Sequence, residues 1–365
     1  IVSHDNVINQ EEFCAPPENV LAQPLRAPCI CGKIKKKNKD LNMYYIGIDV
    51  GGMSIKGGIV DENGNIIVKD SVVTKPTQPS DDNAKDIAGL VAKLLEDAGI
   101  SRDEIAGMGM GVPGTVDPDT SKIFYTCNIF FRDYDFRAEF KKYFDFPVYI
   151  GNDADCAVIG ESVFGDMKGV QNAVMVTLGT GVGTGTIVKG NLISGFKGAG
   201  GEGGHTVIRM GGEKCGCGRR GCWEAYASAT ALIRDTKRAM EKHPESLMNE
   251  IVKKEGKVTG RTAFDAMNAG DKTAKALVSR YIRYVGEGLV NIGNYIRPEI
   301  IFMGGGISNQ VDWFIKRLQA YVTRYSYGGK RNPYIKVVKA TLKNEAGILG
   351  AAALAAKNRH NFATF

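Results

Sequence analysis

Length, composition and charge already exclude several classes of protein. The chain has 365 residues, 43% of them hydrophobic and 24% charged, which is long enough for two domains with separate cores. Eight cysteines are too few for a disulfide scaffold, and their clustering suggests a metal or redox role in a reducing compartment. No apolar run approaches the about 20 residues that a membrane span requires. We therefore expect a cytoplasmic globular protein with no membrane partner.

The net charge is 47 − 40 = +7, and much of the excess lies late in the chain. Residues 315–343 contain eight basic residues and no acidic one. Such a segment can bind nucleic acid. A solvated face beside an anionic small-molecule site is the better interpretation, so we expect no nucleic-acid partner.

The first 42 residues differ from the rest of the chain. They contain no apolar signal-peptide core and end in the polar run KIKKKNKDLN, directly before MYYIGIDVGG. They also lack the helical periodicity of a helix-turn-helix DNA-binding domain. We predict a disordered N-terminal extension over residues 1–42 and a natural start at Met43.

Apolar segments alternate with glycine turns from residue 44 onward. The order is strand, glycine turn, strand, Asn-Gly hairpin turn, strand, helix and strand. The predicted elements are strands at 44–49, 55–61 and 66–73, a helix from Ile87 to Ala98 that Gly99 ends, and a strand at 105–112 that Pro113 closes.

A later passage repeats this order. Residues 173–193 again combine an apolar strand, a glycine turn, a second strand and a polar turn. Two copies of one unit indicate a duplicated architecture, with a lobe on each side of a cleft. The predicted elements that follow are helices roughly from Ala225 to Ala276 and from Tyr281 to Tyr295, a strand EIIFM, and a small-residue helix EAGILGAAALAA.

Three glycine turns each follow an apolar strand, at Asp49–Gly52, Gly179–Gly185 and Gly304–Gly306. Glycine lets backbone N–H groups approach phosphate oxygens, so the three turns favour a nucleotide held between lobes. The phosphate-binding loop G-x-x-x-x-G-K-[ST] is absent from the sequence. The run GMGVPG fits G-x-G-x-x-G, but Pro113 prevents the helix that a Rossmann motif needs.

Three acidic residues are candidates for chemistry at this cleft. Asp49 ends the first strand beside a glycine turn, where it could hold a bridging Mg²⁺ or simply cap the turn. Asp153 and Asp155 follow the strand VYIGN, and one of them could accept the proton of an attacking hydroxyl. A helix N-cap is the structural alternative for these acids.

The run GGEKCGCGRRGCWE places Cys215, Cys217 and Cys222 on a glycine-rich loop. Three thiolates on such a loop can share one Zn²⁺, and His205 is the candidate for the fourth ligand. A disulfide between Cys215 and Cys217 would be strained. A treble-clef zinc finger is a fairer alternative, but its second C-x-x-C pair is absent.

The segment GEGGHTVIRMGGEKCGCGRRGCWE resembles the signature of the ROK family of sugar kinases and repressors. IDVGGMSIKGG, GVPG, GNDADCAVIGE, LGTGVGTG and MGGGIS also resemble blocks of that family in the same order. The resemblance implies an α/β, two-lobed, actin-like ATPase fold with a ribonuclease H-like duplication and a nucleotide and sugar cleft between lobes. It also implies a small lobe of residues 43–152 and 345–365, and a large lobe of residues 153–344 that carries the zinc loop.

The resemblance further implies ATP-dependent phosphorylation of a hexose at its 6-hydroxyl, with Mg²⁺ catalytic and Zn²⁺ structural. Asp153 would be the base. The implied sugar ligands are Asn128, Asn152, Asp153, Glu202, His205 and Glu224. The implied nucleotide-binding residues are Asp49, Gly51, Gly52, Lys56, Gly179, Thr180, Gly181, Gly183, Gly304, Gly305 and Gly306. The zinc ligands would be His205, Cys215, Cys217 and Cys222.

Three positions depart from the family pattern. Met53 replaces the usual Thr and Thr184 the usual Gly, and both changes could weaken ATP binding. Asp155 replaces a usual Asn, and we expect it to point away from the base. The leading prediction is a glucokinase that acts as a homodimer. A kinase for fructose, mannose, allose or N-acetylmannosamine, or a sugar-responsive transcriptional regulator, are the alternatives.

Overall fold

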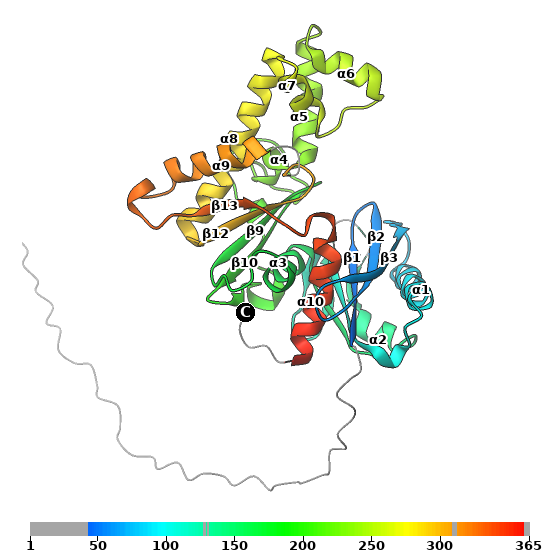
Figure 1. Cartoon of the computed structure of the whole chain (residues 1–365). Helices are drawn as coiled ribbons and strands as arrows, with labels where there is room; N and C mark the ends of the chain where they lie inside the picture. The colour runs from blue at the N-terminus through cyan, green and yellow to red at the C-terminus, as the bar shows by residue number, and fades with distance from the viewer. Residues whose placement is uncertain (1–42, 127–128, 130, 309–311, 361–365) are drawn as a thin grey trace, which may run out of the picture. The chain divides into compact units, whose positions relative to one another are not determined.

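The computed structural model describes residues 43–126, 129, 131–308 and 312–360 (Figure 1). The predicted extension over residues 1–42 lies outside this range. The described residues belong to one compact unit. The predicted division into lobes at residue 153 stays a prediction.

The first sheet has five strands in the order β3-β2-β1-β4-β8. Its strands are β1 (Tyr44–Val50), β2 (Ser54–Val60), β3 (Ile66–Val73), β4 (Ile105–Val112) and β8 (Val148–Asn152). Strand β1 is antiparallel to β2 and parallel to β4, which is parallel to β8. The carboxyl ends of three parallel strands therefore meet at one edge.

Two helices and a small sheet complete this part of the chain. They are α1 (Ser80–Ala98), α2 (Phe136–Phe140) and the three-stranded sheet β5 (Gly114–Val116), β6 (Lys122–Thr126) and β7 (Arg132–Asp135). Helix α1 buries Ile87, Leu90 and Leu94 at the spacing the sequence predicts. Gly99 ends it in the left-handed conformation, with φ of 64°.

The second sheet repeats the first in the order β11-β10-β9-β12-β13. Its strands are β9 (Ala173–Leu178), β10 (Val182–Val188), β11 (Asn191–Leu192), β12 (Ile300–Gly304) and β13 (Lys336–Lys339). Strand β9 is antiparallel to β10 and parallel to β12, as β1 is to β2 and β4. The duplication that the sequence predicts is confirmed.

The segment after the cysteines is helical, as predicted. Its helices are α4 (Glu224–Ala227), α5 (Ala229–Lys242), α6 (Leu247–Glu255), α7 (Thr262–Asn268) and α8 (Lys272–Tyr295), and α9 (Asp312–Tyr325) follows β12. The predicted break between residues 276 and 281 is wrong, because α8 runs through it. Leu277, Val278, Tyr281 and Ile282 form one buried stripe across this point, so packing favours a continuous helix.

Two helices, α3 (Asp153–Phe164) and α10 (Ala346–His360), pack against each other between the sheets. Figure 1 shows them side by side near β10 and β1. Glycine permits the approach, since a Cβ on Gly350 would lie 1.9 Å from the carbonyl oxygen of Cys156. The small-residue C-terminal helix that the sequence predicts is thereby confirmed as a close-packing element. Across the described ranges, no helix is both long and apolar enough to cross a membrane.

Candidate active site

The predicted catalytic and nucleotide-binding residues gather at the carboxyl ends of parallel strands. Asp49 lies near the end of β1, and Asp153 directly follows β8 in the same sheet. The turns at 179–181 and 304–306 follow β9 and β12, which are neighbours in the second sheet. Ligands of open α/β sheets bind at this edge, so the topology alone favours a site here.

The first glycine turn joins β1 to β2. The Gly51 amide donates to the Ser54 carbonyl at 3.1 Å, and the Thr74 hydroxyl donates to the Gly51 carbonyl at 2.6 Å. The Gly51 amide is therefore used within the turn. Met53, the residue that departs from the family pattern, is 86% exposed and fills no core position.

Asp49 lies within β1 rather than in the turn, which removes the turn-capping interpretation. It is paired across the sheet with Lys56. Burial raises the pKa of Asp49, and the charge of Lys56 opposes that shift. The charge of Lys56 is therefore the main interaction that favours the ionised form of the Asp49 carboxyl.

The second glycine turn has different constraints. A Cβ on Gly181 would lie 2.3 Å from the Glu224 carboxylate, and one on Gly183 would lie 3.1 Å from the Cβ of Ala154. A side chain at either position would therefore press on neighbouring side chains. Gly179 has open space at its Cβ position, although its amide donates to Gly181 within the turn at 3.1 Å. Thr180 is exposed, and its carbonyl accepts from the Thr230 hydroxyl at 2.8 Å.

The third turn lies against the second. Gly305 has φ of +83° and a Cβ there would lie 2.4 Å from the Leu178 carbonyl oxygen. Gly304 packs on Met175, whereas Gly306 is exposed with open space beside it. Gly179 and Gly306 are therefore glycines of these two turns where a ligand could approach the backbone.

Asp153 begins helix α3, and Asn152 is its N-cap. The Asn152 side-chain oxygen accepts from the amides of Ala154 at 2.9 Å and Asp155 at 3.3 Å, and its Nδ2 donates to the Gly114 carbonyl at 3.0 Å. The N-cap alternative for Asp153 is wrong, because Asn152 fills that role. The Asp153 carboxylate accepts a hydrogen bond from the Ala154 amide at 2.9 Å, and the residue is exposed.

Asp153 is exposed at the surface, but many neighbouring atoms of the chain partly desolvate its carboxyl. Desolvation is the main cause that raises its pKa to about 7, and the negative charges of Asp49 and Glu202 add to the shift. A carboxyl with a pKa near neutrality, reachable by a substrate, has the properties of a general base.

We expected Asp155 to point away from the base, and the direction of its side chain stays a prediction. It is buried on α3, and burial together with the charges of Asp153 and Glu202 raises its pKa to about 7. Both acids lie in the first turn of the helix, and the charge of Asp153 is one cause of the Asp155 shift. The two acids therefore interact through their charges.

Glu202 and Glu224 approach this group from the segment that carries the cysteines. Glu202 is exposed, and its pKa is raised by desolvation, lowered by the charge of His205 and raised by that of Glu224. The Glu224 carboxylate accepts from the Val182 amide at 3.1 Å. Sequence reasoning missed this last contact, which ties α4 to the second glycine turn.

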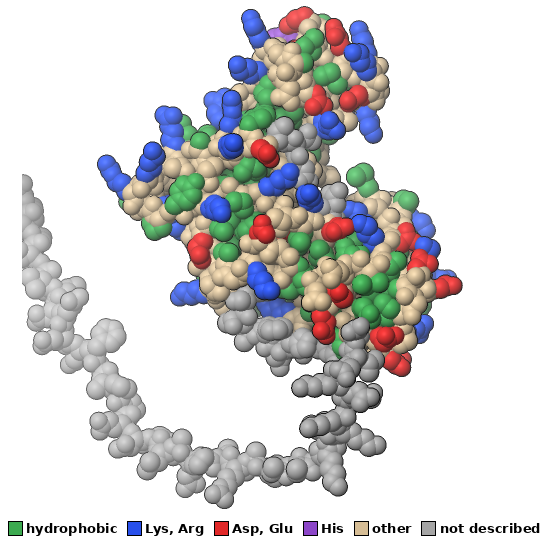
Figure 2. All heavy atoms as spheres, in the orientation of Figure 1, with side chains coloured by type: hydrophobic (Ala, Val, Ile, Leu, Met, Phe, Trp, Pro, Cys, Tyr) green, Lys and Arg blue, Asp and Glu red, His purple; other side chains and the backbone are tan. Residues whose placement is uncertain are grey.

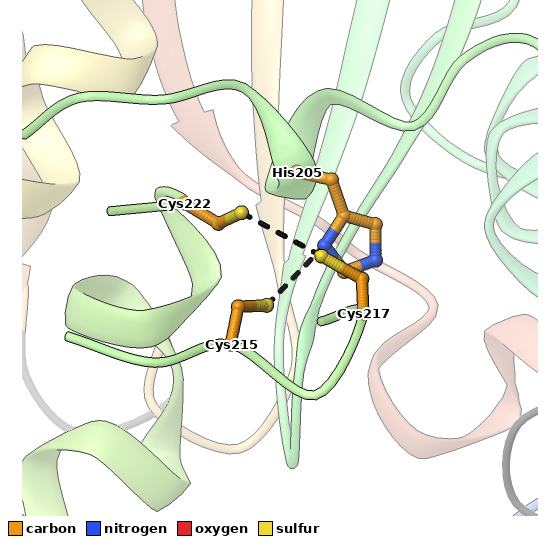
Figure 3. A group of neighbouring side chains, drawn as sticks. All are labelled: His205, Cys215, Cys217 and Cys222. Atoms are coloured by element: carbon orange, nitrogen blue, oxygen red, sulfur yellow. Dashed lines mark hydrogen bonds between the residues drawn. The ribbon is translucent and has the colours of Figure 1, made fainter. Parts of the chain in front are cut away.

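The four predicted metal ligands come together, as Figure 3 shows. One ring nitrogen of His205 and the Sγ atoms of Cys215, Cys217 and Cys222 all lie within 4.8 Å of one another. Cys215 Sγ is 3.5 Å from His205 Nδ1, and Cys217 Sγ is 3.7 Å from Cys222 Sγ. Ligand atoms of a tetrahedral Zn²⁺ site with three thiolates lie about 3.8 Å apart, so the cluster fits this ion.

Backbone contacts shape this loop. The Cys215 amide donates to the Arg219 carbonyl at 2.9 Å, and Val207 and Cys222 form an antiparallel bridge. Arg219 Nη1 donates to the His205 carbonyl at 3.4 Å, and the Arg219 charge lowers the pKa of Cys222 against the effect of burial. The Arg219 guanidinium therefore lies close enough to the cluster for its charge to offset that of the thiolates.

The predicted acids of the site influence one another's pKa values: Asp49 and Glu202 raise that of Asp153, and Glu224 raises that of Glu202. The cysteine cluster lies beside them. Lys56 belongs to the same site because it is paired with Asp49 across the sheet. Asn128 lies outside the described residues. Gly52 is exposed in the first turn.

Comparisons with known proteins identify the family of this chain. The sequence model of the ROK family matches residues 45–358. The glucokinase of Halalkalibacterium halodurans is 35% identical over 311 residues, which are 84% of this chain and 93% of that protein. The xylose repressor of Bacillus subtilis is 30% identical over 312 residues, 85% of this chain and 76% of the repressor.

A solved structure supports the fold. The ROK family glucokinase from Streptomyces griseus, in complex with glucose and AMPPNP, has 31% identity and a TM-score of 0.76, covering 86% of this chain and 99% of its own. The fold of this chain is accordingly the two-lobed, actin-like ATPase fold. The chain belongs to the ROK family of proteins.

Proposed function

We propose that this protein is a hexose kinase that transfers the γ-phosphoryl group of ATP to the 6-hydroxyl of D-glucose. The observation that carries the proposal is the position of Asp153. Its exposed carboxyl lies at the carboxyl end of β8, with a pKa raised to about 7, beside further acids and two glycine turns. The glucokinase relatives support the choice of sugar.

Asp153 would act on the hydroxyl that attacks. As the sugar oxygen forms its bond to the γ-phosphorus, the bond from that phosphorus to the β–γ bridging oxygen breaks. The Asp153 carboxylate accepts the hydroxyl proton in the same step. Asn152 supports this geometry, because its capping hydrogen bonds fix the first turn of α3.

The nucleotide would lie against the second and third glycine turns. Gly179 and Gly306 leave open space for a phosphate to approach, whereas Gly181 and Gly183 act through packing. Lys56 and Asp49 line the facing edge of the first sheet. Asp49 is the candidate ligand for Mg²⁺, which would neutralise phosphate charge, and an oxygen donor beside several other acids suits this ion.

Glu202, His205 and Glu224 would hold the sugar hydroxyls. Carboxylates accept two hydrogen bonds each, which suits neighbouring hydroxyls of a hexose. A structural Zn²⁺ held by His205 Nδ1 and the three thiolates would fix the orientation of the imidazole, so that its Nε2 atom can face the sugar. Glu224 starts α4 directly after the loop, so the same ion would steady it.

The direct test is coupled ADP release with Mg·ATP over a panel of hexoses, followed by NMR identification of the phosphorylated position. We expect turnover on glucose and a product that carries phosphate on oxygen 6. A different preferred sugar would keep the mechanism and change the substrate. No turnover on any hexose would overturn the proposal.

The similarity to a xylose repressor supports a second candidate, a sugar-responsive regulator. Figure 2 shows Lys and Arg side chains spread over the visible face among acidic and hydrophobic ones, not gathered in one patch. Within the basic segment, Arg317 and Arg324 lie over the rings of Trp313 and Tyr325. A DNA-binding assay with salt titration separates the candidates, since a regulator would bind with a steep salt dependence. The homodimer and the cytoplasmic location stay predictions.

A further inference from the structure

Thr184 is the residue of β10 that stands where the family pattern has glycine. Its side chain is buried, with 8% exposure. The hydroxyl donates to the Gly201 carbonyl and accepts from the Gly203 amide at 2.9 Å. A position that we expected to weaken nucleotide binding therefore makes two hydrogen bonds to the loop that carries Glu202.

The two bonds hold both ends of one tight turn. The Gly203 amide also donates to the Gly201 carbonyl at 2.8 Å, and Glu202 between them has φ of −77° and ψ of 54°. These values define an inverse γ-turn with Glu202 at its apex. The backbone of such a turn makes one hydrogen bond of its own, and the Thr184 hydroxyl adds a further bond to each of the two residues that this bond joins.

The methyl group of Thr184 contributes as well. A Cβ on Gly203 would lie 2.7 Å from the Thr184 hydroxyl oxygen and 3.0 Å from its methyl carbon, so the turn lies directly on the whole side chain. Gly204 continues this contact, since its Cβ would lie 2.1 Å from the Val182 carbonyl oxygen. The loop backbone at Gly203 and Gly204 therefore packs directly against β10.

The turn sets two features of the site. The Glu202 charge reaches both Asp153 and Asp155, whose pKa values it raises. The Glu202 carbonyl accepts from the His205 amide at 3.0 Å, which links the same turn to the cysteine cluster.

We propose that Thr184 is a positioning residue, which fixes the Glu202 γ-turn and thereby the Glu202 carboxylate against the substrate. The inference rests on the proposed role of Glu202 as a sugar ligand.

The test compares Thr184→Val, which removes the hydroxyl but keeps the shape, with Thr184→Ser, which keeps the hydroxyl. Thr186→Val is the matched control, since Thr186 lies on the same strand with the same 8% exposure. For Thr184→Val we expect the KM for the sugar to rise about tenfold, as loss of such hydrogen bonds predicts, with the KM for ATP changed less than twofold. Thr184→Ser and Thr186→Val should both stay within about threefold of the parent.

Hydrogen exchange gives a readout that does not depend on turnover. We expect the Gly203 amide to exchange about tenfold faster in Thr184→Val than in the parent or in Thr186→Val. Equal exchange in all three variants, or an equal rise in the sugar KM for the two valine variants, would overturn the positioning role. An inactive parent with the expected exchange pattern would instead overturn the proposed function and leave the restraint of the turn established.

Discussion

The two strand–turn–strand units, β1–β2 and β9–β10, share a backbone plan but differ in the source of their charge. In the first, Asp49 and Lys56 face each other across the strands. In the second, the pair at the corresponding register is Thr177 and Gly183, which carries no charge. Its acid, Glu224, comes from another segment and binds the Val182 amide. The first unit therefore carries an acid and a base at paired positions of its own strands, whereas the acid of the second unit comes from a different segment.

Each strand–turn–strand unit is covered by a helix that follows the other sheet along the chain. Strand β8 of the first sheet leads into α3, which packs on β10 of the second, and the segment after β13 leads into α10, which packs on β1. In both places glycine allows helix backbone to touch the strand. A Cβ on Gly47 would lie 2.0 Å from the Ile348 carbonyl oxygen, and one on Gly185 would lie 2.4 Å from that of Ala154. The shared plan thus depends on close packing, while charge is free to differ.

The largest expected effect tests this shared packing. Gly47→Ala and Gly185→Ala should each lower the free energy of unfolding by about 1–3 kcal/mol or more, because the added methyl meets a backbone carbonyl in both. Gly89→Ala on α1 is the control, since nothing lies within 4 Å of its Cβ position. It should raise stability by about 0.5–1 kcal/mol. Denaturant unfolding measures the stability of all three variants. A Gly47→Ala or Gly185→Ala protein as stable as the parent would contradict the shared role of close packing.

The second unit takes its acid, Glu224, from the segment that directly follows the cysteine loop. Cys217→Ser should lower zinc content, measured by atomic absorption of the purified protein, and weaken sugar binding about 10- to 100-fold, because the loop positions Glu224 and His205. Cys156→Ser is a control thiol in α3, away from the loop. A Cys217→Ser protein with zinc content and sugar affinity equal to those of the parent would contradict the structural role of the metal.

A smaller effect concerns Asp155. Its pKa rises from 3.8 when exposed to about 7 in the folded protein, so the folded state holds a proton that the unfolded chain has released within this window. Stability therefore falls as pH rises from about 4 to about 7. Asp155→Asn should raise Tm more at pH 8 than at pH 5, measured without nucleotide or magnesium.

Removing this charge should also lower the pKa of Asp153 and move the acidic limb of the pH–rate profile to lower pH. Asp166→Asn, an exposed acid just beyond the end of the same helix, is the control and should change neither property. An Asp155→Asn enzyme with an unmoved profile would show that the two acids titrate independently.

Much of this architecture could be predicted from local sequence. The strands around each glycine turn, the Gly99 helix end and the small-residue C-terminal helix all follow from periodicity and turn chemistry. The cysteine cluster was equally predictable, since its ligands lie within one short segment.

The remainder depends on contacts between distant segments. Nothing local to Glu224 indicates that its carboxylate fills the space beside Gly181. The departure from the family pattern at Thr184 marked this position as unusual. It did not indicate that the Thr184 hydroxyl bonds to the turn that carries Glu202. The unbroken α8 was mispredicted, and the burial of Asp155 was not predicted at all, because tertiary packing decides both.

The most direct test of the account is ADP release on glucose by the parent and by Asp153→Asn, with Asp166→Asn as the control. The account predicts a fall in kcat of about 10²- to 10⁴-fold for Asp153→Asn, with glucose still bound, and no change for Asp166→Asn. Undiminished turnover by Asp153→Asn would contradict the assignment of the base, and turnover by none of the three proteins would contradict the kinase.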